Sequence, residues 1–101
     1  MTEVQITRWR DIPSLITARD GDALAKVQLP SRFQEAIDEA AMRMSATGAY
    51  AYMEGWIRDP WLAVAGSPSE AAEAVAADLE AQWSPEALNA LLDSLGPAPE
   101  E

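Results

Sequence analysis

The hydrophobic pattern of this chain changes its period between Pro30 and Ser31, and that change constrains the fold. Before this point, apolar and polar side chains alternate, which is the period of a strand with one buried face. After it, apolar side chains recur every three or four residues, which is the period of an amphipathic helix. The sequence therefore predicts an α+β fold, in which a small, mainly antiparallel sheet of three or four strands carries three or four helices.

The N-terminal part of the chain predicts three strands. The first lies in residues 4–9, and residues 11–13 are expected to interrupt the sheet because proline cannot donate a ladder hydrogen bond. The second and third strands, residues 14–19 and 23–29, are joined by Asp-Gly-Asp at 20–22, a strong hairpin signal. We expect these two strands to pair, with Ile16 and Ala18 on the same face as Ala25, Val27 and Leu29.

Residues 31–48 give the clearest helical pattern. Ser31 followed by Gln34 has the form of a capping box, and Gly48 is the expected end. Phe33, Ile37, Ala40 and Met44 make the apolar stripe.

The second half predicts shorter elements. Residues 49–58 favour a second helix, which Asp59-Pro60 stops, and the apolar run 61–65 has the length of a fourth strand. Ser-Pro pairs at 67–68 and 84–85 predict two further helix starts. The apolar stripes that follow are Ala72, Val75, Leu79 and Trp83, and then Leu88, Leu91, Leu92 and Leu95.

Length and composition predict one domain, residues 1–96, with a disordered acidic tail at 97–101. The first residues lack an apolar stretch of signal-peptide length, and no apolar run is long enough to span a membrane. We therefore expect a soluble, cytoplasmic protein with no membrane partner.

The charged residues are segregated along the chain. All seven basic residues lie in residues 1–58 beside eight acidic ones, whereas residues 59–101 carry nine acidic residues and no base. The net charge of −10 argues against nucleic acid as a partner, because nucleic-acid binding depends on lysine and arginine contacts to phosphates.

The chain also contains no histidine and no cysteine. This excludes Ser-His and Cys-His nucleophiles and removes the usual zinc ligands. We therefore expect a non-enzymatic protein with no catalytic residue, no cofactor and no metal.

Two groups of residues suggest contacts. Arg8, Arg10, Arg19 and Lys26 are interleaved with Trp9 on the predicted sheet. They could bind an anion or an acidic peptide with Trp9 as an aromatic anchor, although internal pairing with the protein's own acids is the more common arrangement. The aromatic residues form the second group, and they could line a partner groove or supply the bulky core that an alanine-rich chain requires. This group comprises Tyr50, Tyr52, Trp56 and Trp61, with Met53 among them.

Three segments, ITRWRDIPS, AKVQLPSRFQEAIDEAAMR and AYMEGW with a later PW, resemble the small bacterial virulence factor domain family. The resemblance covers roughly residues 3–83, and the 88–95 helix falls outside the familiar pattern. The residues that carry it are Trp9, Arg10, Ile12, Pro13, Lys26, Leu29, Arg32, Phe33, Gln34, Ala36, Ile37, Tyr52, Trp56 and Trp61.

The resemblance implies an accessory or docking role, because the family's domain occurs alone or attached to a larger helical-repeat protein. Stand-alone members accompany folate- and corrinoid-linked methyl-transfer proteins in proteobacteria. The resemblance supplies no catalytic residue.

The sequence thus leads to a virulence-associated protein-interaction module or accessory subunit with an unidentified protein partner. The alternative is a small-ligand or anion-binding domain that serves a folate or corrinoid one-carbon methyl-transfer system. Its pocket is expected near Arg10, Arg32, Tyr52 and Trp56. The candidate contact residues are Arg8, Trp9, Arg10, Lys26, Arg32, Tyr52 and Trp56.

Overall fold

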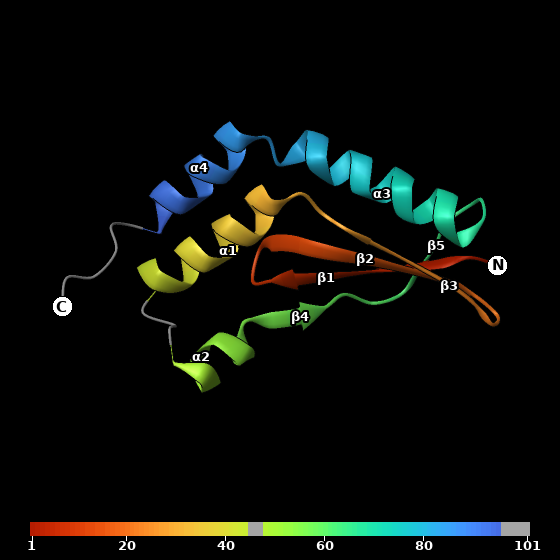
Figure 1. Ribbon diagram of the computed structural model, residues 1–101, viewed down its shortest axis with the longest axis horizontal. Coiled ribbons are helices and arrows are strands. Elements are labelled where there is room, and N and C mark those ends of the chain that lie inside the picture. Colours follow the sequence, from red (N-terminus) through yellow and green to blue (C-terminus); the bar gives the residue numbers. More distant parts are fainter. Residues whose placement is uncertain (45–47, 96–101) are drawn as a thin grey trace.

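The computed structural model describes residues 1–44 and 48–95, and within them it shows the expected α+β fold. A mainly antiparallel sheet lies beneath helices α1, α3 and α4, and α2 lies on the other side of it (Figure 1). The elements are β1 Glu3–Trp9, β2 Ile12–Asp20, β3 Ala23–Gln28, α1 Ser31–Arg43, α2 Ala49–Glu54, β4 Trp56–Arg58, β5 Leu62–Ala63, α3 Pro68–Gln82 and α4 Pro85–Ser94.

The strands are ordered β3-β2-β1-β4, and the short β5 also pairs with β1. The predicted β2–β3 hairpin is confirmed, with Ile16 opposite Val27 and Ala18 opposite Ala25. Gly21 sits in its turn at φ +60, a conformation that glycine adopts without strain.

The predicted interruption at residues 11–13 is wrong. Trp9 pairs with Ile12, so only Arg10 and Asp11 form the turn, and Pro13 lies inside β2 opposite Arg8. The β1–β2 register shifts between Thr7 and Arg8. A proline is tolerated within a sheet at such a bulge, because the bulge already disrupts the ladder of hydrogen bonds.

Residues 49–65 also differ from the prediction. The second helix ends at Glu54, and Trp56–Arg58 form β4 against β1 instead of continuing the helix. The predicted strand at 61–65 is reduced to β5. Pairing with β1 explains both differences, because the chain runs along β1 before and after Pro60. Arg58 lies opposite Thr7, and Ala63 lies opposite Glu3.

The helix starts are partly as predicted. Ser67 and Ser84 cap α3 and α4 with their side chains, and Pro68 and Pro85 occupy the first turns. The predicted capping box at Ser31 is absent, since Pro30 is the N-cap of α1 and no side-chain cap bond forms. Helix α1 also ends at Arg43 and not at Gly48.

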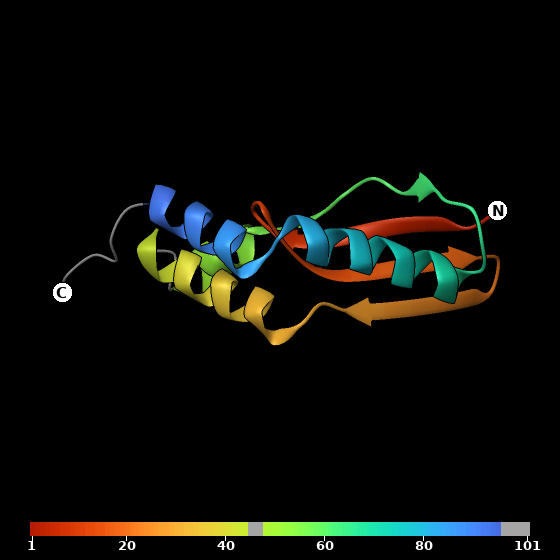
Figure 2. The ribbon, with the colours of Figure 1, turned by 90° about the horizontal axis from the view of Figure 1, so that it is seen from above.

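The core lies between the sheet and the layer formed by α1, α3 and α4. Seen from above, α3 runs along the strands while α1 and α4 lie side by side at the other end (Figure 2). The fully buried side chains of α3 are alanines at 71, 72 and 76, which let its backbone approach β2 and β3, while Val75 and Leu79 are partly buried against the same core. Ile16 and Ala18 of β2 are fully buried. Phe33 and Ile37 of α1 are buried with them, as the helical stripe predicts.

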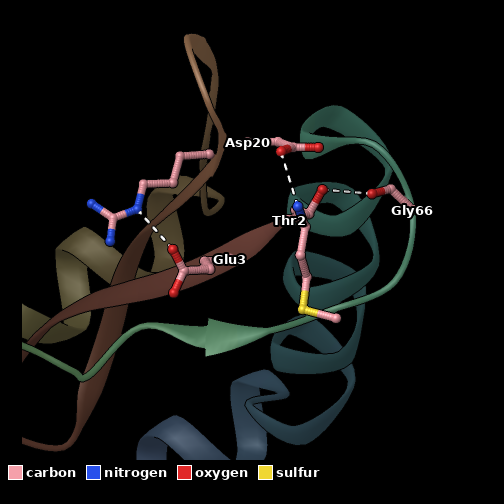
Figure 3. Close-up of polar contacts among 6 residues, drawn as sticks. Thr2, Glu3, Asp20 and Gly66 are labelled. Carbon is pink, nitrogen blue, oxygen red and sulfur yellow. Dashed lines mark hydrogen bonds and ion pairs between the residues drawn. The ribbon is translucent and has the colours of Figure 1, made fainter.

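The end of the molecule that holds β5 is closed by polar contacts (Figure 3). Thr2 Oγ1 donates to the Gly66 carbonyl at 2.6 Å, and the side chain of Arg19 pairs with Glu3 at 3.3 Å. The Arg19 guanidinium also lies 3.7 Å from the centre of the Trp61 ring. These contacts hold the start of β1 between the β2–β3 hairpin and the start of α3.

Candidate functional site

A groove opens beside the β1–β2 turn, at the end of the molecule where α1, α2 and α4 gather (Figure 1). We call it the turn groove. It has a volume of about 360 Å³. Its lining residues are Arg8, Trp9, Arg10, Asp11, Ile12, Ala40, Met44, Ile57, Leu91 and Leu95. The groove thus has apolar walls and a charged rim supplied by the turn.

Trp9 is a wall of the groove and not an exposed anchor. It is only 1% exposed, its ring stacks on Tyr52 at 5.9 Å, and its Nε1 donates to the Tyr52 carbonyl at 2.8 Å. Tyr52 meets Trp56 edge-on at 6.0 Å. The expectation that Trp9 offers its ring to a partner is therefore corrected, because α2 covers it.

Tyr52 and Trp56 are partly buried and pack against the core. For these two residues the interpretation as bulky core side chains is the better one. Neither lines the turn groove, so the pocket expected near Arg10, Arg32 and this aromatic pair contains only Arg10.

Arg10 occupies the turn itself and has an uncommon backbone. Its φ is 53, in the left-handed region that few residues other than glycine adopt. Its N–H donates to the Gly55 carbonyl at 2.8 Å, and its guanidinium Cζ lies 5.3 Å from the centre of the Trp9 ring. The side chain is exposed, and within residues 1–44 and 48–95 it has no acidic partner.

Arg8 also lines the groove but is already paired. Its Nε donates to Asp59 Oδ1 at 2.8 Å, and both side chains are partly buried. This pair joins β1 to the segment after β4. The two arginines of the predicted basic face therefore have different surroundings: one is neutralised internally and the other is available.

Lys26 and Arg32 lie outside the groove. Lys26 is exposed on β3, opposite Thr17 of β2. Arg32 reaches from α1 to the end of α3, where it donates to the carbonyls of Glu80 at 3.1 Å and Trp83 at 3.4 Å. Helix ends leave such carbonyls without partners, so Arg32 stabilises the fold. It also borders a hollow of about 200 Å³ between α1 and α4.

Several residues of the groove were missed by sequence reasoning. Met44 follows the last turn of α1 and is 37% exposed, and Ile57 is 40% exposed on β4. Met44 belongs to the helical stripe of α1, and Leu91 and Leu95 to that of α4, and none of the three was among the predicted contact residues. The signal that could have revealed the groove is that both stripes extend to the helix ends, beyond the part of each helix that covers the sheet.

Further exposed apolar side chains lie at the same end of the molecule as the groove. On α2, Tyr50 is 80% exposed and Met53 is 66% exposed, and Met42 at the end of α1 is 48% exposed. Five of the eight exposed large apolar residues in the described part of the chain therefore lie at this one end.

The described residues provide neither a membrane span nor a metal site of clustered ligands. No helix in 1–44 or 48–95 is long and apolar enough to cross a membrane. In the same ranges, no three acidic side chains are placed to hold a metal ion together.

Comparison with known proteins gives one match. The pattern of the family described as "Virulence factor" matches residues 7–92. No curated protein matches the chain, and no solved structure does. The match includes Leu88, Leu91 and Leu92 of α4, so the expectation that this helix falls outside the family pattern is corrected. Because the match spans most of the sequence, this chain belongs to the virulence factor family.

Proposed function

We propose that this protein is a non-enzymatic protein-interaction module or accessory subunit that docks onto a partner protein through the turn groove. The observation that carries the proposal is that exposed Met44 and Ile57 line the groove, at an end of the molecule that also carries exposed Met42, Tyr50 and Met53. Exposed apolar surface at a hollow in a soluble domain commonly marks an interaction site.

The kinds of residue at this end support docking. Methionine and tyrosine are frequent at protein interfaces, since methionine adapts its shape and tyrosine offers a large amphipathic surface. Met44, Met53 and Tyr50 supply these properties. The exposed leucines of the described chain, Leu24 and Leu62, lie on β3 and β5, away from the groove.

The test compares two double variants of equal chemistry. Met53→Ser with Ile57→Ser removes apolar surface at the groove end, and Leu24→Ser with Leu62→Ser removes it at other exposed positions. We expect proteins captured from a native lysate by the wild type, and quantified by mass spectrometry, to be lost from the first variant and retained by the second. Equal capture by both variants contradicts docking at the groove, and circular dichroism checks that both are folded.

The second candidate is a small-ligand or anion-binding domain that serves a folate or corrinoid one-carbon system. Its supporting observation is the groove volume of about 360 Å³, which falls in the range of about 300–1,000 Å³ typical of ligand pockets. Folic acid or cobalamin would then raise the melting temperature of the wild type and not of Arg10→Gln. No shift with either compound counts against this candidate.

A further inference from the structure

We infer that the turn groove selects a partner segment in which a carboxylate lies next to an apolar side chain, and that Arg10 binds the carboxylate. This inference rests on the proposed docking function and names the chemistry of the docked segment.

Arg10 is available at the groove, whereas Arg8, Arg19, Arg32 and Arg43 are engaged in contacts within the protein. Arg8 is paired with Asp59, and Arg19 with Glu3. The α1 arginines are also engaged. Arg32 donates to the carbonyls that end α3, and Arg43 pairs with Glu39 of its own helix and donates to the Leu92 carbonyl of α4. The Arg10 guanidinium lies over the Trp9 ring and forms no ion pair within residues 1–44 and 48–95, which leaves its planar set of donors open to an incoming carboxylate.

The backbone of the turn fixes the position of Arg10. A two-residue hairpin turn with a positive φ is best made by glycine or asparagine, and an arginine there is strained. The Gly55 carbonyl holds the Arg10 N–H in place, so the guanidinium leaves the turn from a fixed point. A residue held in an unfavourable backbone conformation by its surroundings is a frequent feature of binding sites.

The groove and Arg10 together are complementary to a segment that carries an acidic and an apolar side chain. The groove beside Arg10 is walled by Ile12, Met44 and Ile57, so a segment that fills it must present an apolar side chain near its acidic one. Burial of this chain's apolar walls excludes water around the ion pair and strengthens it. The net charge of −10 disfavours polyanions such as nucleic acids and acidic membranes, and a single carboxylate is what one arginine can bind.

The experiment uses phage-displayed random peptides selected on the full chain. Peptides enriched by the wild type should carry Asp or Glu beside Leu, Ile, Met or Phe. A synthetic enriched peptide should bind Arg10→Gln roughly ten- to a hundredfold more weakly than wild type, the cost of one charge-assisted hydrogen bond. Its Glu→Gln analogue should lose the same factor on wild type and nothing further on Arg10→Gln, as expected for two groups that contact each other.

Arg58→Gln is the matched control. Arg58 is exposed on β4, one position from Ile57, and within the described ranges it also has no acidic partner. The substitution removes the same charge from a residue that does not line the groove. Neighbouring strand residues point to opposite faces and exposed charges are screened by salt, so the peptide affinity should stay within about twofold of wild type. Arg10→Gly, which suits the positive φ, should fold and still lose the peptide.

The outcomes separate this inference from the proposed function. Enriched peptides without an acid, or equal affinity for wild type and Arg10→Gln, overturn the role of Arg10. The docking function then still stands if Met53→Ser with Ile57→Ser abolishes peptide binding. If neither set of substitutions changes binding, or no peptide is enriched, both proposals fail.

Discussion

Arg8 and Arg10 lie two positions apart on the same hairpin, yet their surroundings differ completely. Asp59 neutralises Arg8, whereas Arg10 is set apart by the turn and by its positive φ. The sequence predicted a basic face with both residues, and it left open whether that face was free or internally paired. It could not decide between these alternatives because the partner of Arg8 is 51 residues away in the chain.

The burial of Trp9 likewise could not be predicted from its neighbours in the sequence. Strand alternation placed it opposite Val4 and Ile6, where solvent was expected. The structure puts α2 over it, and the ring is buried against Tyr52 and Gly55. The alternation of apolar and polar residues in β1 does not show that a short helix distant in the chain packs against Trp9.

The contact between Trp9 and Gly55 gives a prediction about stability. A Cβ at position 55 would overlap the indole ring, so Gly55→Ala should cost about 1–3 kcal/mol in the free energy of unfolding, the usual cost of overpacking. The control is Gly48→Ala, where nothing lies within 4 Å of the added atom. Its effect should stay below about 1 kcal/mol, because a weaker N-cap and a less flexible unfolded chain oppose each other. Urea denaturation measures both, and equal effects would contradict the packing of Gly55 on Trp9.

At the scale of elements, the segments with local signals were predicted and those decided by tertiary pairing were not. The Ser-Pro starts of α3 and α4 and the Gly21 turn depend on neighbouring residues, and all three are confirmed. The change from helix to strand after Glu54 depends on pairing with β1, and residues 55–58 contain no local sequence signal for that pairing. The helical spacing in that segment correctly predicts α2 as far as Glu54. Beyond it, hydrogen bonding to the edge of β1 outweighs the helical preference of Trp56–Arg58.

Two of the three serines predicted to cap helices, Ser67 and Ser31, provide a matched test. Ser67 accepts a hydrogen bond from the Glu70 N–H, while the Glu70 carboxylate accepts one from the Ser67 N–H. Ser67→Ala should therefore reduce the free energy of unfolding by about 1 kcal/mol. Ser31→Ala should leave it nearly unchanged, because Ser31 is inside α1 and makes no cap bond. Thermal unfolding followed by circular dichroism compares them, and a larger loss at Ser31 would show that the start of α1 is wrongly placed.

At the scale of the whole molecule, the charge pattern of the chain becomes a pattern in space. Helices α3 and α4 carry acidic residues and no base, and they form much of the layer that covers the sheet (Figure 2). The apolar side chains gather at the end that holds α2 and the turn groove, beside the unpaired Arg10. The sequence predicted the layer and its charge. It did not predict the groove, because the groove is assembled from the β1–β2 turn with its flanking strands, from α1, from β4 and from α4, which lie far apart in the chain.

The central claim is that this end of the molecule meets a partner, and site-specific photo-crosslinking tests it most directly. A benzophenone amino acid replaces Met44 in the groove in one variant and Leu24 on β3 in another, since both side chains are exposed. After irradiation of cells that make each variant, the account predicts a discrete crosslinked protein from position 44 and none from position 24. Crosslinks from position 24 alone, or from neither position, would contradict it.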